Sequence, residues 1–269
     1  GVAKITNLPW VIDTAKLSAK LGGLPVRLLN DLQSTALGTL ALGPESFAEL
    51  QPGSATSSAD PNGTIAVIAP GTGLGEAMLL WDGARYISLP SEGGHADFAP
   101  GTDDEIELLH HLRKLHGHHV SYERVLSGPG IGDLYGFVRG KESFGFGPEP
   151  VWLAQQIATG DRNAVVATAA VERKDAACEK ALQMFAEILG AEAGNLALRG
   201  MATGGVVIGG GIPPKILPVL QAGGLVQRFN DKGRFSSWTK ALGLRVTLEP
   251  RASLLGAAHY VATSKDHKS

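Results

Sequence analysis

The sequence predicts an α/β fold, because short apolar runs of strand length are followed by helical patterns. Residues 26–29 form one such run, and a helical pattern begins after it at Leu32. Residues 205–208 form another, and a helix is expected to open at Pro213 because proline is favoured in a first helical turn. We therefore expect residues 26–29 and 205–208 to be buried strands, the former in a parallel arrangement.

Composition limits the function classes. The 269 residues are 43% hydrophobic, which is enough for one large domain or two ordinary ones. A net charge of -2 offers no basic surface for nucleic acid or an anionic membrane. Cys178 is the single cysteine, so neither an internal disulfide nor a cysteine zinc site can form. The sequence has no apolar run of membrane-spanning length and opens on no signal peptide. We expect a soluble, cytoplasmic protein.

Asn30 and Asp31 follow the first expected strand, at the point where a helix begins. Ligands bind at this end of the strands in open α/β sheets. Asparagine and aspartate are also common helix caps, and for an arbitrary Asn-Asp pair capping alone is the better interpretation.

The next elements are expected to be strands. Residues 43–63 are rich in small and polar residues and predict a loop, whereas residues 64–69 are β-branched and apolar. A second apolar run covers 77–81, and Asp82-Gly83 predicts a hairpin turn before a third strand over 85–89.

A glycine-rich turn joins the first two of these strands. Such a turn can present backbone N–H groups to phosphate oxygens. The dinucleotide fingerprint fails because Glu76 stands in its sixth position and a strand follows, and a P-loop lacks its Lys-Ser/Thr pair. The residues of the turn are Gly71, Thr72, Gly73, Leu74 and Gly75.

Glu92 and His95 are separated only by Gly93 and Gly94. Two glycines allow a bend that aims both side chains at one small object. A carboxylate and an imidazole together accept and donate hydrogen bonds, which suits a ligand with several hydroxyl groups. A glycine-rich turn with a solvated Glu92 is an equally good interpretation of the residues alone.

A capping box at Thr102 predicts a helix that ends at Gly117. We expect Ile106, Leu115 and the leucines between them to form its apolar stripe. Histidines crowd this helix and its end, but their spacing matches no standard metal-ligand set, so we expect surface histidines and no metal site. They are His110, His111, His116, His118 and His119.

The second half of the chain is mostly helical. Helices are expected over 131–138, 150–159 and most of 163–198, where Gly190 and Gly194 would allow another element to approach closely. Gly128-Pro129-Gly130 is expected to break the chain before the first of these helices. A strand over 244–248 and a helix over 254–262 complete the prediction.

The strand over 205–208 ends in Gly209, Gly210 and Gly211. A strand that is followed by three glycines and the start of a helix would allow a nucleotide to lie against the bare backbone. A tight strand-to-helix turn explains the same pattern nearly as well.

In this order the motifs resemble the ATP-dependent bacterial glucokinase family, of the kind without a cysteine zinc motif. The run Leu-Pro-x-Glu-Gly-Gly-His-x-Asp-Phe-Ala-Pro carries most of the resemblance, which extends over residues 6–260. The other segments are Asn30-Asp31, the 71–75 turn, Glu123 in Ser-Tyr-Glu-Arg-Val-Leu-Ser-Gly-Pro-Gly, Gly209–Gly211 and Asp-Lys-Gly-Arg-Phe.

The resemblance implies an actin-like, ribonuclease H-like sugar kinase of two lobes that uses ATP and Mg²⁺, and a homodimer. Residues 1–42 with 253–269 would form an incomplete small lobe, and 43–252 the large lobe. Asp31 would be the general base for the sugar 6-hydroxyl. The other assignments are Asn30, Glu92, His95 and Glu123 for the remaining glucose hydroxyls, Gly71, Thr72, Gly73 and Gly75 for phosphates, and Gly209, Gly210 and Gly211 for adenosine.

One departure from the family pattern affects the expected activity. The family begins with an Asp-x-Gly-Gly-Thr hairpin that grips the terminal phosphates, and no such sequence occurs here. We therefore expect a chain that starts partway through the small lobe, lacks the first strands and has impaired turnover. A non-catalytic sugar-binding module is the alternative. A sugar-responsive repressor is disfavoured by the mild negative charge and the lack of an added helix-turn-helix segment.

Overall fold

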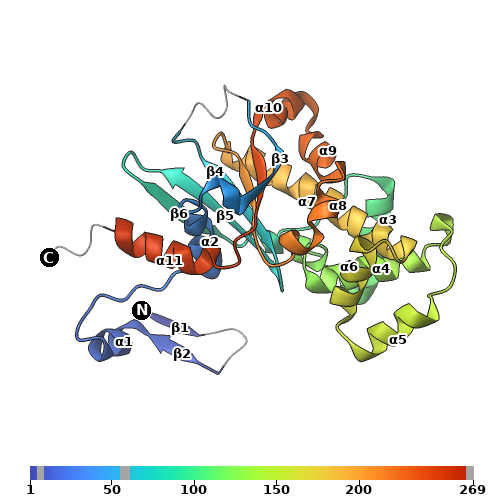
Figure 1. Ribbon diagram of the computed structural model, residues 1–269, viewed down its shortest axis with the longest axis horizontal. Coiled ribbons are helices and arrows are strands. Elements are labelled where there is room, and N and C mark those ends of the chain that lie inside the picture. Colours follow the sequence, from blue (N-terminus) through green and yellow to red (C-terminus); the bar gives the residue numbers. More distant parts are fainter. Residues whose placement is uncertain (5–8, 55–60, 265–269) are drawn as a thin grey trace.

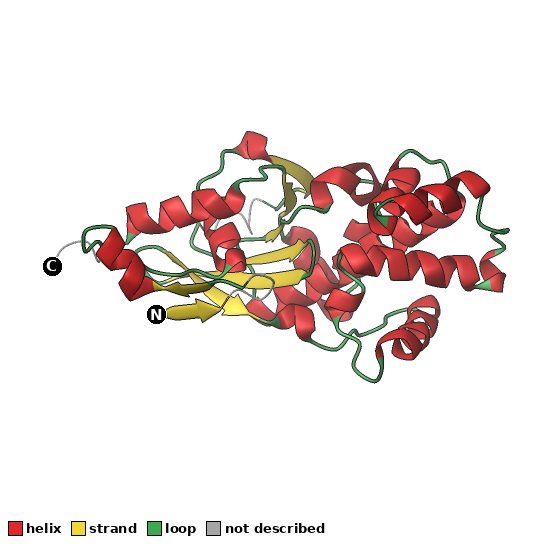
Figure 2. Cartoon of the chain, turned by 90° about the horizontal axis from the view of Figure 1, so that it is seen from below, coloured by secondary structure: helices red, strands yellow, loops and turns green. Residues whose placement is uncertain are grey.

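The computed structural model describes residues 1–4, 9–54 and 61–264. A six-stranded sheet with helices on both faces forms its centre, and a separate two-stranded hairpin lies near the N-terminus (Figure 1). The strands lie toward the end of the molecule that carries the N-terminus, and most helices lie toward the other (Figure 2). The predicted α/β fold is confirmed.

The sheet mixes parallel and antiparallel pairing. Its order is β3-β8-β7-β4-β5-β6, with β7 parallel to both β4 and β8 and the remaining pairs antiparallel. Apart from β3, the strands correspond to the predicted ones, with shifted ends. Their bounds are β3 (Phe47–Gln51), β4 (Ile65–Pro70), β5 (Leu74–Trp81), β6 (Tyr86–Ser91), β7 (Val206–Ile208) and β8 (Leu244–Thr247).

Strand β4 separates two hydrophobic cores. Successive side chains of a strand point to opposite faces, so Ala66 and Ile68 enter the larger core while Ile65 and Val67 enter the smaller one. Helices α4 (Gly128–Gly140), α6 (Arg162–Val171) and α7 (Ala176–Gly200) contribute to the larger core, whereas α2 (Asp31–Thr39) and α11 (Ala252–Thr263) contribute to the smaller. The sheet is therefore buried on both faces where β4 runs.

The long helix α7 carries the predicted buried face and the predicted close approach. Its side chains Leu182, Phe185 and Leu189 are fully buried. A side chain at Gly190 would overlap the Leu225 carbonyl of α9 (Gly224–Asn230), and one at Gly194 would also meet the backbone of α9. The remaining elements are β1 (Val2–Lys4), β2 (Val11–Asp13), α1 (Thr14–Lys20), α3 (Asp103–His116), α5 (Val151–Thr159), α8 (Leu217–Leu220) and α10 (Ser236–Ala241).

One strand assignment and one loop assignment made from the sequence are wrong. Residues 26–29 are not a strand, because no described strand pairs with them and the N-terminal hairpin pairs only with itself. The expected loop over 43–63 contains β3, which pairs with β8. Its partner is almost two hundred residues away in sequence, so local composition could not reveal it.

Two helix details also differ. Gly128-Pro129-Gly130 opens α4 rather than breaking the chain, because Ser127 caps the helix and proline fits its first turn. In α3, Ile106 is 45% and Leu115 54% exposed, so the buried stripe is narrower than expected. No helix in the described ranges is both long and apolar enough to cross a membrane.

Helices α2 and α11 approach so closely that only glycine fits between them. A side chain at Gly256 would overlap the Ser34 carbonyl, and one at Gly38 would overlap the Ala252 carbonyl. Because α2 begins at Asp31, this contact holds a predicted site residue in place.

We predict that Gly256→Ala lowers the free energy of unfolding by about 1–3 kcal/mol, because an added methyl group forces the two helices apart. Urea unfolding measures the change. Gly140→Ala is the control, since a methyl group there meets no atom within 4 Å. Equal stability of the two variants would show that α2 and α11 can separate without cost.

Candidate functional site

A polar cavity of about 370 Å³ lies at the end of β4 where the chain turns into β5. It brings together side chains that lie far apart in the sequence and that the family resemblance assigns to glucose. The residues come from the start of α2, from the segment after β6 and from the short helical turn that contains Glu123. They are Asn30, Asp31, Glu92, His95 and Glu123.

Asn30 and Asp31 owe their positions to the first turn of α2. Asn30 Oδ1 accepts hydrogen bonds from the backbone N–H groups of Leu32 at 2.8 Å and Gln33 at 3.4 Å, so the capping interpretation is confirmed. Asp31 Oδ1 accepts from the Leu32 N–H at 2.9 Å. This bond fixes the Asp31 carboxyl group against the first turn of the helix. Capping and a place in the cavity are compatible for this pair.

His95 lies between two carboxylates without a direct hydrogen bond to either. Its Nε2 is 3.9 Å from Glu92 Oε2, and its Nδ1 is 4.0 Å from Glu123 Oε1. Glu92 is 84% exposed, whereas Glu123 is 33% exposed and its Oε2 accepts a hydrogen bond from the Leu74 N–H at 3.0 Å. Glu123 is thereby fixed to the start of β5, while Glu92 and His95 keep their polar atoms for a ligand.

The glycine-rich turn between β4 and β5 forms one wall of the cavity. The Gly71 N–H donates to the Gly73 carbonyl at 2.8 Å, and the Gly71 carbonyl accepts from the Gly128 N–H at 2.8 Å. The second bond ties the turn to the start of α4. A side chain at Gly73 would overlap the Glu123 carboxylate, and one at Gly75 would overlap Leu32. The glycines therefore allow four segments to meet.

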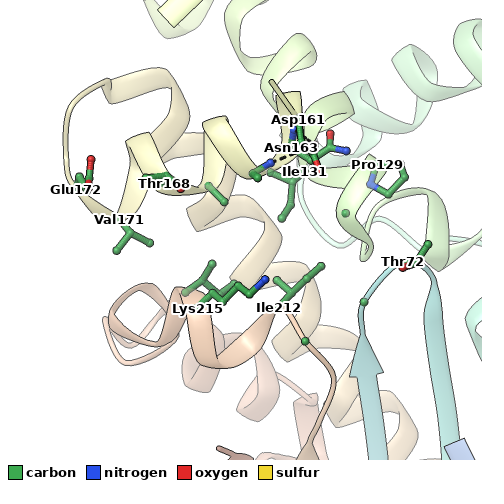
Figure 3. Close-up of a pocket in the computed structure, with 16 residues that line it drawn as sticks. Thr72, Pro129, Ile131, Asp161, Asn163, Thr168, Val171, Glu172, Ile212 and Lys215 are labelled. Carbon is green, nitrogen blue, oxygen red and sulfur yellow. Dashed lines mark hydrogen bonds between the residues drawn. The ribbon is translucent and has the colours of Figure 1, made fainter. Parts of the chain in front are cut away.

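A second cavity, of about 790 Å³, adjoins the first at this turn. Gly71 and Thr72 line both cavities. Thr168 and Val171 of α6 lie on one side and Lys215 on the opposite side (Figure 3). The sequence analysis missed these residues. A single basic side chain after three glycines and two prolines was the available signal for Lys215.

The three glycines after β7 take different positions. Gly210 lines the smaller cavity and Gly211 the larger, whereas Gly209 lines neither of these two. Gly210 has a φ of +89°, and a side chain there would overlap the Pro70 carbonyl. Glycine at this position is therefore required by the backbone itself.

Two histidines of α3 and its exit pair with separate aspartates. His116 lies 2.7 Å from Asp133, and His119 lies 2.9 Å from Asp97. His111 and His116 are half-buried rather than on the surface as expected, and burial lowers the pKa of His111. Within residues 1–4, 9–54 and 61–264, no group of three potential ligands could hold a metal ion.

A family model, related sequences and solved structures all indicate the same family. The sequence model of the glucokinase family matches residues 1–264. A glucokinase of Nostoc punctiforme is 39% identical over 270 residues, which cover 96% of this chain and 77% of the relative. The crystal structure of a glucokinase from an Antarctic psychrotroph is 32% identical and superposes with a TM-score of 0.82, covering 98% of this chain and 77% of that one.

A more distant structure shares the fold. It is a ROK family glucokinase from Streptomyces griseus in complex with glucose and AMPPNP, 19% identical with a TM-score of 0.57, and the match covers 91% of this chain and 70% of that chain.

Glu76 is a buried acid directly beneath the site, which the sequence analysis noted only as a mismatch to a glycine motif. It lies on β5, is fully buried, and is close to Glu192 of α7. Burial raises the pKa of Glu76 from 4.5 to about 7, and the charge of Glu192 acts in the same direction, while Arg199 lowers it. A charged residue inside an apolar strand was the signal that could have identified it.

We predict that ionisation of Glu76 makes stability depend on pH. Below pH 4.5 the carboxyl group is protonated whether folded or unfolded. Between pH 4.5 and about 7 the folded chain keeps a proton that the unfolded chain has lost. The free energy of unfolding therefore falls as pH rises through this window, by on the order of 3 kcal/mol.

Urea unfolding of the wild type and of Glu76→Gln between pH 4 and 8 isolates this contribution. Because the amide of the variant stays neutral, the difference between the two stabilities should change with pH while the other titrating groups cancel. Parallel stability curves would contradict the prediction.

Proposed function

The chain belongs to the glucokinase family, and from that premise we propose that it transfers the γ-phosphoryl group of ATP to the 6-hydroxyl group of glucose. The observation that carries the proposal is the pair of cavities that meet at Gly71 and Thr72. Phosphoryl transfer depends mainly on holding donor and acceptor in line and on stabilising charge. Two adjoining cavities with glycine-rich backbone between them supply that arrangement.

We assign glucose to the smaller cavity. Its carboxylate, imidazole and amide groups offer both donors and acceptors, as a polyhydroxyl ligand requires. Asp31 is the general base in this assignment, because it shares the cavity wall with the 71–75 turn and a carboxylate can accept the proton of the attacking hydroxyl. The residues assigned to the other hydroxyl groups are Asn30, Glu92, His95 and Glu123.

We assign ATP to the larger cavity, with its phosphates toward the shared turn. The Gly71 N–H donates within the turn, so the backbone amides assigned to phosphate are those of Thr72 and Gly73. The N-terminus of α4 adds a positive partial charge beside them. Gly211 and Lys215 line this cavity and face the nucleotide in this assignment. A neighbour of the same fold was crystallised with glucose and AMPPNP.

Mg²⁺ would accompany ATP. This ion keeps several water ligands and is usually bound through one or two carboxylates and the substrate phosphates, so a ready-made cluster of protein ligands is not needed. The ion would neutralise phosphate charge.

A non-catalytic sugar-binding module is less well supported, because a pure sugar sensor has no use for a second large cavity at the same turn. Isothermal titration with glucose and with Mg·ATP separates the two functions. The lobes at 1–42 with 253–269 and at 43–252 and the homodimer stay predictions. Sedimentation tests the dimer.

We predict that Asp31→Asn lowers kcat by about 10²- to 10⁴-fold, because an amide cannot accept the hydroxyl proton, while glucose affinity changes little. A coupled assay for glucose 6-phosphate measures it. Asp103→Asn is the control, since Asp103 is also an exposed aspartate in a first helical turn but lines neither cavity. Equal turnover of both variants would remove Asp31 from the role of base.

We also predict that His95→Ala and Glu123→Gln each weaken glucose binding by about 1.5–3 kcal/mol, the range for hydrogen bonds that involve a charged group. Isothermal titration gives the affinities. His110→Ala, an exposed histidine on α3, is the matched control. Unchanged affinity in both site variants would make these residues structural.

A further inference from the structure

The sugar-binding loop, defined here as residues 92–95, rests on a buried carboxyl group. A side chain at Gly93 would overlap Glu76 Oε2, so the backbone of the loop lies directly on Glu76. The Gly93 N–H donates to Ser91 Oγ at 2.9 Å, and Ser91 pairs with Glu76 across β5 and β6. The position of the loop is therefore set from below by one side chain.

That side chain belongs to a pair of buried acids. Glu192 of α7 is also fully buried, and it accepts hydrogen bonds from Arg199 Nη2 and, at 3.0 Å, from Asn195 Nδ2. Arg199 Nη1 is 3.9 Å from Glu76 Oε2, too far for a hydrogen bond. Among the described residues, neither oxygen of Glu76 finds a hydrogen-bond donor. Two buried acids thus share one guanidinium group, and the unsatisfied one can be satisfied by carrying a proton itself.

The same network reaches the segment that carries Glu123. Asn195 Nδ2 donates to the Tyr122 hydroxyl at 3.3 Å, and the Tyr122 N–H donates to the Ala96 carbonyl at 3.0 Å. Lys232 Nζ donates to Asn195 Oδ1 at 2.8 Å. One buried set of polar groups therefore supports both the loop 92–95, which precedes α3, and the segment with Glu123, which follows it.

We propose that Glu76 is a positioning residue for the sugar-binding loop: when protonated it donates a hydrogen bond to Glu192 and holds Glu92 and His95 at the height at which they reach glucose. When Glu76 is ionised, it repels Glu192 and the loop above it shifts. This inference rests on the proposed function.

The charged groups around Glu76 fix the direction of the pH effect. From α7 it faces Glu192 and Arg199; from β6 and the loop it faces Ser91 and the Gly93 backbone. Its neighbour on β4 is the apolar Ile68. Burial and Glu192 place the pKa of Glu76 at about 7. Glucose affinity should therefore fall as pH rises through neutrality.

The test measures glucose affinity of the full chain by isothermal titration at pH 6.0 and pH 8.5. Because histidine side chains in general titrate in this pH range, the informative quantity is the difference between the wild type and Glu76→Gln. The amide introduced by this substitution is neutral at both pH values and can donate to Glu192. At pH 6.0 the glucose affinity of the variant should stay within about twofold of that of the wild type. Between pH 6.0 and pH 8.5 the wild type should lose about three- to tenfold more glucose affinity than the variant loses.

Two further variants and a second ligand separate positioning from general stability. Glu76→Ala removes the support and should weaken glucose binding about tenfold or more at both pH values, while ADP affinity stays unchanged. Glu105→Gln alters another buried acid, which pairs with Arg228 and lines neither cavity, and should behave as the wild type.

The outcomes are distinguishable. Equal pH dependence in the wild type and Glu76→Gln, with glucose bound by both, would overturn the positioning role and leave the proposed function intact. Parallel loss of glucose and ADP binding in Glu76→Gln would also overturn it, because the effect would then be a general one. A wild type that binds no glucose at either pH would overturn the proposed function itself.

Discussion

The backbone of the turn between β4 and β5 is the constraint on which both cavities depend. The Gly71 carbonyl accepts a hydrogen bond from the start of α4, and the Leu74 N–H donates to Glu123. On the other side, the Leu74 carbonyl leaves no room for a side chain at Gly94, and Gly75 leaves none between itself and Leu32. Segments from three distant parts of the sequence are therefore positioned against one turn. Its glycines are needed because larger side chains would not fit between these segments, and not only because glycine makes a turn flexible.

The turn can act in this way because the strand before it is rigidly held. All residues of β4 are buried, and the strand lies between two cores. On the side of α2, the contact of Gly38 and Gly256 with facing carbonyl groups fixes the helix that begins at Asp31. Close-packed interiors transmit small displacements. The accuracy of the polar site therefore comes from apolar and backbone packing behind it, more than from bonds among its own side chains.

Much of this arrangement could be predicted because its signals are local. β-branched runs, the capping residue Thr102, and the spacing of Glu92 and His95 each depend on neighbours in sequence, and the structure has the corresponding elements. What could not be predicted depends on distant partners. Strand β3 exists only because β8 pairs with it, and residues 26–29 fail to form a strand for want of a partner among the described strands.

The same distinction applies to the site. The residues assigned to glucose form motifs, so they could be found from the sequence. Lys215 and Glu76 could not, because their roles depend on the cavity that Lys215 lines and on the loop that lies against Glu76. Glu76 in particular becomes informative only when α7 brings Glu192 to it. An isolated acid in an apolar strand indicates that some partner exists without indicating which.

The exposure of the two loop side chains explains why a buried acid beneath them is useful. Glu92 is 84% and His95 59% exposed, so neither is held by its own burial. A site that must recognise a small polar ligand needs its contacting groups fixed by supporting residues. The loop consists largely of glycine and cannot supply that support from its own side chains. Support must come from below, and the group found there is an acid whose protonation state changes its interaction with Glu192. Burying two acids side by side costs free energy, and in return the pair sets the position of the exposed Glu92 and His95 above it.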